Sequence, residues 1–224
     1  MKSVLFRAQK AYWYFLDLLF PEDCVGCSAR GRVLCQECGQ NLQHSRNPPL
    51  VDIFALFDYR DPVVKKAIWK LKYHKRSHLG KTLGQLLYEG HLEEISDIRM
   101  HAPARSILVI PIPLSRARYK ERGYNQAEKI ALGFCNSDHE EMLELKKNIV
   151  VKKIDTLPQA RIANRAKRLK NIKNAFVVTD TRSISGRTII VIDDVTTTGG
   201  TITEVISTLM KAGAKKVYGF AVAH

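Results

Sequence analysis

The run from Ile189 to Thr201 constrains the fold more than any other part of the chain. It begins with four apolar, β-branched residues, which is typical of a buried strand, and continues into two adjacent carboxylates, Asp193 and Asp194. A turn of threonines and glycines follows, and apolar residues then recur at helical spacing from Ile202 to Met210. The segment therefore predicts a strand, a tight turn and a helix in direct succession.

The predicted turn is suited to binding a phosphate. It places hydroxyl groups and backbone N–H groups at the start of a helix, where the helix dipole favours an anion. Its glycines let the backbone approach that anion closely. Asp193 and Asp194, at the carboxyl end of the strand, can hold two vicinal hydroxyls or a magnesium ion. A phosphate beside a diol outlines a ribose 5-phosphate. The predicted phosphate-binding residues are Thr196, Thr197, Thr198, Gly199, Gly200 and Thr201.

Two common nucleotide-binding motifs are excluded here. No Gly-Lys-Ser/Thr follows the glycines, as a Walker loop requires, and the acidic pair precedes the glycine turn, unlike in a Rossmann fingerprint. An ordinary strand, turn and helix with a polar turn remains the alternative. From Ile189 to Thr201 the chain resembles the 5-phosphoribosyl 1-pyrophosphate (PRPP) signature of type I phosphoribosyltransferases. The resemblance implies PRPP bound with Mg²⁺ and catalytic roles for Asp193 and Asp194.

A second candidate segment follows the apolar strand at 107–110. Its loop carries Arg116, Arg118 and Arg122, whose planar guanidinium groups can each meet two oxygens of a pyrophosphate. The alternative is a basic surface loop. The pattern Pro-Leu-Ser-Arg-x-Arg…Arg-Gly-Tyr-Asn-Gln-Ala, over 113–127, resembles the ComF family of phosphoribosyltransferase-like competence proteins. That family implies a type I phosphoribosyltransferase fold, an α/β fold in which helices flank a parallel sheet.

The resemblance to the ComF family covers nearly the whole chain. The stretch 159–176 resembles the family's flexible loop, in which Arg161, Arg165 and Arg168 would close over the site. Departures are modest, at Thr196 and Gly200. The implied function is binding of PRPP with Mg²⁺ and of single-stranded DNA during DNA uptake in natural transformation, alongside competence or DNA-processing proteins. Two alternatives stay open: a phosphoribosyltransferase of nucleobase salvage, and a PRPP-responsive regulator without turnover.

Four of the five cysteines form two Cys-x-x-Cys pairs separated by seven residues. They are Cys24, Cys27, Cys35 and Cys38. This spacing predicts one structural zinc ion with four thiolate ligands, and glycines inside or beside the pairs help each turn back toward the metal. Disulfides, which a cytosolic protein would not keep, and a redox dithiol are the alternatives.

The net charge of +14 exceeds what one PRPP-sized ligand requires and indicates a polyanionic partner. Aromatic residues are interleaved with cations in one cluster, a composition suited to single-stranded nucleic acid. The predicted nucleic-acid-binding residues are Lys65, Lys66, Trp69, Lys70, Lys72, Tyr73, Lys75 and Arg76. An equally weighted alternative is a solvated helix face around an anionic-substrate site.

Strands and helices alternate after residue 100, which favours a parallel sheet covered on both faces. Upstream, we expect a helix opening at Pro62 and another over 79–94. We expect an amphipathic helix and the zinc module in residues 1–47, and a phosphoribosyltransferase-like domain in 48–224. No apolar run is long enough to span a membrane, so we expect a cytoplasmic protein. Its N-terminal helix either packs on the protein or lies on the inner membrane surface.

Overall fold

The computed structural model describes residues 23–46, 51–74, 76–102, 107–153 and 174–224. The chain forms two compact units, one ending at Leu42 and one beginning at Gln43. In the described part of the first unit, α2 (Gln36–Gln40) follows a turn closed by a bridge between Asp23 and Arg30. The predicted N-terminal helix falls in residues 1–22, outside the described residues.

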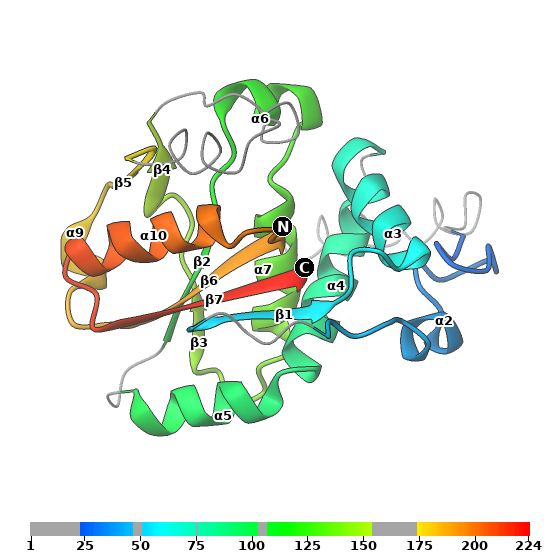
Figure 1. Ribbon diagram of the computed structural model, residues 1–224, viewed down its shortest axis with the longest axis horizontal. Helices are drawn as coiled ribbons and strands as arrows, with labels where there is room; N and C mark the ends of the chain where they lie inside the picture. Colours follow the sequence, from blue (N-terminus) through cyan, green and yellow to red (C-terminus); the bar gives the residue numbers. More distant parts are fainter. Residues whose placement is uncertain (1–22, 47–50, 75, 103–106, 154–173) are drawn as a thin grey trace, which may run out of the picture. The chain divides into compact units, whose positions relative to one another are not determined.

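The second unit is built on a five-stranded parallel sheet in the order β1-β7-β6-β2-β3 (Figure 1). Its strands are β1 (Ile53–Phe57), β2 (Ile107–Pro111), β3 (Leu143–Leu145), β6 (Thr188–Val195) and β7 (Lys216–Ala223). A separate antiparallel pair is formed by β4 (Val150–Lys152) and β5 (Phe176–Val178). The predicted parallel sheet is confirmed.

Helices cover both faces of this sheet. The helix α10 lies over β6 and β7 on one face, and α7 and α4 lie on the other (Figure 1). The helices of this unit are α3 (Pro62–Tyr73), α4 (Ser77–Glu89), α5 (Leu92–His101), α6 (Arg116–Arg122), α7 (Gln126–Asn136), α9 (Thr181–Ile184) and α10 (Gly200–Lys211). Helix α3 begins at Pro62, as predicted, because the Asp61 carboxylate accepts hydrogen bonds from the first free N–H groups.

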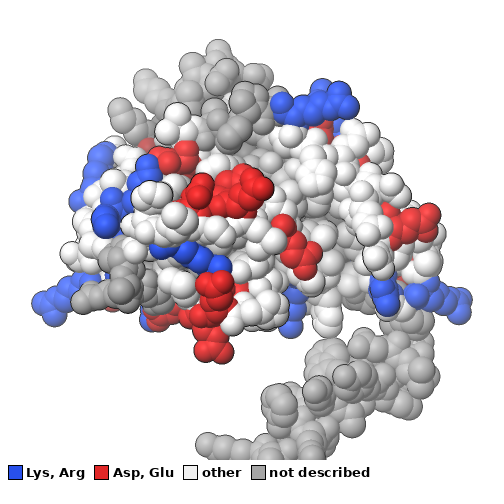
Figure 2. Space-filling view, turned by 90° about the horizontal axis from the view of Figure 1, so that it is seen from below, with Lys and Arg blue, Asp and Glu red and all other residues white. Residues whose placement is uncertain are grey.

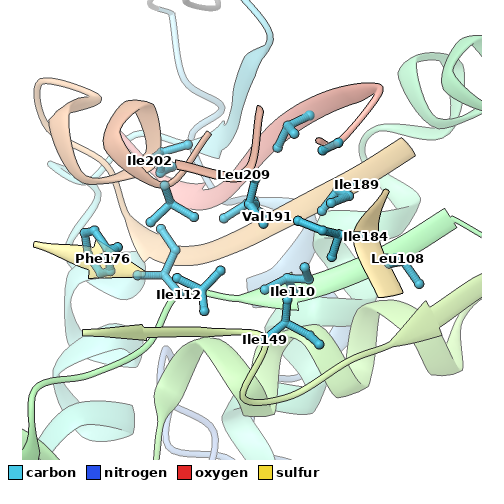
Figure 3. Close-up of a cluster of buried hydrophobic side chains, with 14 of the residues drawn as sticks. Leu108, Ile110, Ile112, Ile149, Phe176, Ile184, Ile189, Val191, Ile202 and Leu209 are labelled. Atoms are coloured by element: carbon cyan, nitrogen blue, oxygen red, sulfur yellow. The ribbon is translucent and has the colours of Figure 1, made fainter. Parts of the chain in front are cut away.

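Strand β6 is buried on both faces, which explains its unbroken apolar sequence. Ile189 and Val191 point toward α10 and pack against Ile202, Val205 and Leu209 (Figure 3). The alternate residues of β6 face α7 on the other side of the sheet. Burial of these side chains, about 1.5–3 kcal/mol each, fixes the register of the strand and therefore the height at which its acidic pair emerges.

Helices α4 and α7 pack along each other at glycines. A Cβ atom at Gly84 would lie 2.0 Å from the carbonyl oxygen of Ile130, and one at Gly133 would lie 2.1 Å from that of Lys81. Only residues without a side chain allow the two backbones this approach. The close pairing holds α7, which carries the end of the arginine loop, firmly on the sheet.

The helix predicted over 79–94 is wrong in its extent. The structure ends α4 at Glu89 and begins α5 at Leu92, with Gly90 as the C-cap of α4. A Cβ at Gly90 would lie 2.3 Å from a terminal methyl group of Leu56, so a larger residue here would require the Leu56 side chain to shift. Apolar periodicity continues across the break, and the sequence pattern therefore joined two helices.

Charge is unevenly spread over the surface. Figure 2 shows the α5 side, where acidic side chains gather toward the middle of the face and most Lys and Arg lie nearer its edges. Helix α5 itself supplies Glu93 and Glu94 in its first turn. The positive excess is therefore not concentrated on this face. Within the part of the chain that the structure describes, every helix is too short or too polar to span a bilayer.

Candidate functional site at the carboxyl edge of the sheet

The strand order reverses between β2 and β6. From β2 the chain passes through α7 to β3 on one side, and from β6 it passes through α10 to β7 on the other. The connections leaving β2 and β6 therefore diverge and leave a crevice at the carboxyl ends of these strands. In open α/β sheets, ligands bind at this kind of crevice. The two loops singled out in the sequence are the ones that leave these strands.

The acidic pair lies at this edge, within the last three residues of β6. Because side chains alternate along a strand, Asp193 follows the α10 face and Asp194 follows the opposite face. The backbone N–H of Asp194 donates to Oδ1 of Asp193 over 2.8 Å. The two carboxylates are thus presented on either side of one strand, a short distance apart.

Asp193 is poorly solvated. Burial, and next the neighbouring charge of Asp194, raise the pKa of Asp193 to about 7, although the backbone hydrogen bond and the charges of Lys72 and Arg118 oppose the rise. The charged form of a carboxylate in this position is stabilised by a cation or a hydroxyl donor that approaches it. These influences also show that α3 and α6 bring positive charge to Asp193.

Asp194 forms an ion pair with Lys72 of α3. The Nζ–Oδ1 distance is 3.1 Å, and the side chains are 20% and 12% exposed. The sequence pattern predicts Lys72 as a nucleic-acid-binding residue and not as part of this site. No sequence signal could have done so, because the two residues are far apart in the chain and both segments are continuous, ordinary elements.

The threonine–glycine turn leads directly from β6 into α10. Thr196 is buried, and its N–H donates to the carbonyl oxygen of Ala223, while Thr197 is exposed. Gly199 has φ of 73°, a left-handed conformation that favours glycine, and forms the N-cap. Among the described residues no side chain caps α10, so its first N–H groups face the turn. Thr198, Gly200 and Thr201 lie at this turn and are all partly exposed. This arrangement can bind an anion.

The three arginines of α6 do not act together. Arg116 is exposed and lines a cavity of about 630 Å³ with Tyr119 and residues of β4. Arg118 carries a charge that acts on Asp193. Arg122 is buried and donates from Nη1 to Oε1 of Gln126 over 2.8 Å. Of the three, Arg118 is therefore the one whose charge the structure connects to the acidic pair.

The Arg-Gly-Tyr-Asn-Gln stretch holds elements together. The Arg122 guanidinium lies 5.4 Å from the centre of the Tyr73 ring, and the Tyr124 hydroxyl donates to the carbonyl oxygen of Leu71. The Asn125 amide caps α7 and donates to the carbonyl oxygen of Ile112 over 2.9 Å. The stretch therefore ties the last turn of α3 to the loop after β2, a structural role that its basic composition did not reveal.

The exposed side of α3 carries aromatic rings among cations. Trp69 and Tyr73 are 51% and 52% exposed, and the centre of the Trp69 ring lies 4.3 Å from that of His74. Lys65 and Lys66 are exposed on the same helix, whereas Lys70 and Arg76 are partly exposed. Lys75, Arg161, Arg165 and Arg168 lie outside the described residues. The described residues of the predicted nucleic-acid cluster are thus exposed or partly exposed, and one of them, Lys72, pairs with Asp194.

In the first unit, Cys24, Cys27, Cys35 and Cys38 come together, with all four sulfur atoms within 4.8 Å of one another. The Sγ atoms of Cys27 and Cys35 are 3.7 Å apart, close to the roughly 3.8 Å edge of a tetrahedron with Zn–S bonds of about 2.3 Å. The four thiols could hold a metal ion such as zinc.

The thiols are also polarised for metal binding. Burial raises the pKa of Cys24, but backbone N–H groups of Cys35, Cys27 and Gly26 outweigh it and lower that pKa to about 6. The pKa of Cys38 rises to about 12, first through its hydrogen bond with the Cys35 side chain and then through burial. The Cys24 thiol therefore ionises more readily than the Cys38 thiol, and a bound cation would favour the thiolate form of both.

The chain matches a known protein domain, and it is similar in sequence to several known proteins. Residues 138–224 match the phosphoribosyl transferase domain. The DNA utilization protein YhgH of Escherichia coli O157:H7 is 28% identical over 206 residues, which cover 87% of this chain and 86% of that protein. Competence protein F of Haemophilus influenzae strain Rd is 26% identical, with the same coverage. Competence protein ComFC of Bacillus subtilis strain 168 is 25% identical over 92% of this chain and 86% of that protein.

The matched domain spans β3 to β7 and so includes the acidic pair and the turn into α10. The relatives extend the similarity over most of the chain, well beyond that domain. With its parallel sheet and flanking helices, the chain has the type I phosphoribosyltransferase fold, and over most of its length it is similar to competence and DNA utilization proteins.

Proposed function

We propose that this protein binds PRPP with Mg²⁺ at the carboxyl edge of the sheet and binds single-stranded DNA across α3, and that it serves DNA uptake. The observation that carries the first part is the pairing of Asp193 and Asp194 with the uncapped start of α10 at the point where the strand order reverses. Asp193 and Asp194 hold the ribose hydroxyls and Mg²⁺, and residues from Thr196 to Thr201 hold the 5-phosphate.

Mg²⁺ would suit this site because Asp193 and Asp194 offer hard carboxylate oxygens, and it would supply Lewis-acid stabilisation of negative charge on the diphosphate. Arg118 adds a fixed positive charge near the same position, and in this proposal it meets the diphosphate. Arg116 and Arg122 were predicted to do the same. The exposed position of Arg116 lets it reach a longer or second anion, and buried Arg122 serves by holding α3.

Binding of PRPP is tested by calorimetry with and without Mg²⁺. The wild-type protein is expected to bind PRPP only with Mg²⁺, and the variant with both Asp193→Asn and Asp194→Asn is expected to lose that binding. Both exchanges keep the size of the side chains, and denaturation curves check that the variant folds. Unchanged affinity in this variant contradicts the proposed site.

Single-stranded DNA is supported by the exposed side of α3. Its two half-exposed rings offer faces for base stacking, worth about 1–3 kcal/mol per base, and the surrounding lysines pair with phosphates. The relatives are named for DNA utilization and for competence, which agrees with this ligand. The zinc ion held by the four cysteines keeps the first unit folded, and thiolate ligands fit a reducing cytoplasm.

DNA binding is tested by the fluorescence anisotropy of a labelled oligothymidine at several salt concentrations. Trp69→Ala is expected to weaken binding about 5- to 100-fold. The double variant Lys65→Ala and Lys66→Ala is expected to make affinity depend less on salt. The slope of log affinity against log salt concentration should become shallower by about 0.7 for each phosphate that is no longer neutralised. The matched control is the double variant Lys211→Ala and Lys215→Ala. It removes the same charge from exposed positions just before the amino end of β7. Equal effects of the two lysine pairs contradict a DNA site on α3.

Turnover separates the proposed function from the salvage alternative. Release of pyrophosphate from PRPP with one nucleobase makes the protein a salvage enzyme, and release with DNA indicates chemistry on the incoming strand. PRPP binding without release, across nucleobases and short single strands, favours a protein that senses PRPP while it handles DNA. The double Asp→Asn variant provides the blank.

A further inference from the structure

Lys72 is placed in the site by more than its own ion pair. Its neighbours on either side are both held by residues at the end of α6 and just after it, because the Tyr124 hydroxyl donates to the carbonyl oxygen of Leu71 and Arg122 lies over the Tyr73 ring. Leu71 is fully buried and anchors the last turn of α3 in the core. Lys72 is thus fixed at its backbone and directs its ammonium group to Asp194.

The ion pair occupies a functional carboxylate. The Nζ atom of Lys72 is 3.1 Å from Oδ1 of Asp194, and both side chains are mostly shielded from water. A ribose hydroxyl or a Mg²⁺ ion that approaches Asp194 competes for the same oxygen atoms. When Asp194 turns to such a ligand, the ammonium group of Lys72 loses its partner beside the ligand and needs another anion.

A ligand that carries its own anion at that point satisfies both groups. PRPP does so, because its diphosphate is attached to the ribose carbon next to the two hydroxyls, whereas ribose 5-phosphate has no anion there. The charge of Lys72 also reaches Asp193, together with that of Arg118. Two cations from two different helices therefore act on the acidic pair.

We propose that Lys72 is a specificity-determining residue, which pairs with Asp194 in the free protein and transfers to the diphosphate when PRPP binds. The inference rests on the proposed PRPP site and deepens it. It gives the site a preference for diphosphate-bearing pentoses over ribose 5-phosphate, because only the former replace the partner that Lys72 gives up. While no ligand is present, the ion pair with Lys72 balances the charge of Asp194.

The test compares the affinities for PRPP and for ribose 5-phosphate, by calorimetry at one fixed Mg²⁺ concentration. Lys72→Met keeps the length of the side chain but removes its charge. We expect it to lower the ratio of the two affinities about 10- to 100-fold, as for the loss of one charge-assisted hydrogen bond. Lys72→Arg keeps the charge and is expected to retain most of the preference. Lys211→Met, at an exposed position in the last turn of α10, is expected to leave the ratio unchanged.

The ratio distinguishes specificity from a structural role. If Lys72→Met weakens both ligands by the same factor, Lys72 serves only to hold Asp194 or α3, and the inference is overturned. An unchanged ratio overturns it as well. If the wild-type protein binds neither ligand, the proposed PRPP site itself fails, which differs from a wild-type protein that binds PRPP without a contribution from Lys72.

Discussion

Asp193→Asn is expected to stabilise the ligand-free protein while removing a residue that its proposed ligand needs. Asp193 is held in a poorly solvated position beside a second carboxylate, and both conditions oppose its charge. The exchange removes that charge but keeps an Oδ1 atom that can accept the hydrogen bond from the Asp194 N–H. The folded state therefore loses a penalty and keeps its local geometry.

The magnitude follows from the pKa. A rise from 3.8 to about 7 corresponds to an upper limit of roughly 4 kcal/mol at about 1.36 kcal/mol per pH unit. Because Asp193 is partly exposed, water screens part of this, and we expect about 1–3 kcal/mol. The folded protein binds the proton more tightly than the unfolded chain, so the wild-type free energy of unfolding falls as pH rises from about 4 to 7. The difference between variant and wild type is absent near pH 4 and complete above pH 7.

The assay is chemical denaturation of both proteins between pH 5 and 8, without Mg²⁺ or PRPP. Asp194→Asn is the matched variant. It also removes one of two neighbouring charges, but it breaks the ion pair with Lys72, so its expected change is about 1 kcal/mol or less in either direction. If Asp193→Asn gives no stabilisation at pH 8, or gives the same stabilisation at pH 5, the reasoning from burial and like charge is refuted.

Two further changes test the packing and the cysteine cluster. Gly84→Ala is expected to lower the free energy of unfolding by about 2–4 kcal/mol, because its Cβ would lie 2.0 Å from the Ile130 carbonyl oxygen, which outweighs the gain of about 1 kcal/mol in helix propensity. A denaturation midpoint equal to that of the wild type contradicts this. Cys27→Ser is expected to reduce bound zinc, measured by elemental analysis, well below one ion per chain, whereas Cys135→Ser, at a position outside the cluster, is expected to keep it. Equal zinc in both variants contradicts the four-thiolate site.

The sequence predicts those parts of the site that a single continuous segment encodes. The strand β6, its acidic pair and the turn into α10 are consecutive, so hydrophobic pattern and turn chemistry specify them together. The four cysteines cluster as predicted for the same reason, since their spacing within 15 residues restricts the geometry. The parallel sheet follows from the alternation of strands and helices, although its strand order does not.

Contacts between distant segments were beyond the sequence pattern. Arg122 has the same side chain as Arg116 and Arg118, but only the fold shows that its guanidinium is buried against Gln126 and Tyr73. Lys72 looks like its neighbours on a basic helix, and only the fold shows that its ammonium group meets Asp194. Composition describes how many charges a segment has, whereas packing decides which of them meet a ligand.

Helix α3 connects the two proposed ligands. Its exposed side carries Trp69 and Tyr73, while Lys72, from the same turn, reaches Asp194. Arg122 lies over Tyr73, and Tyr124 holds Leu71. A displacement of the last turn of α3 therefore changes both the exposed side of α3 and the site around Asp194. If PRPP draws Lys72 away from Asp194 and shifts this turn, the affinity for DNA changes, and DNA must change the affinity for PRPP by the same factor. The direction of that coupling depends on whether the rings are more exposed when Lys72 pairs with Asp194 or with the diphosphate. A rigid α3, held by the same contacts, gives no coupling, so the size of the effect measures how far this turn moves.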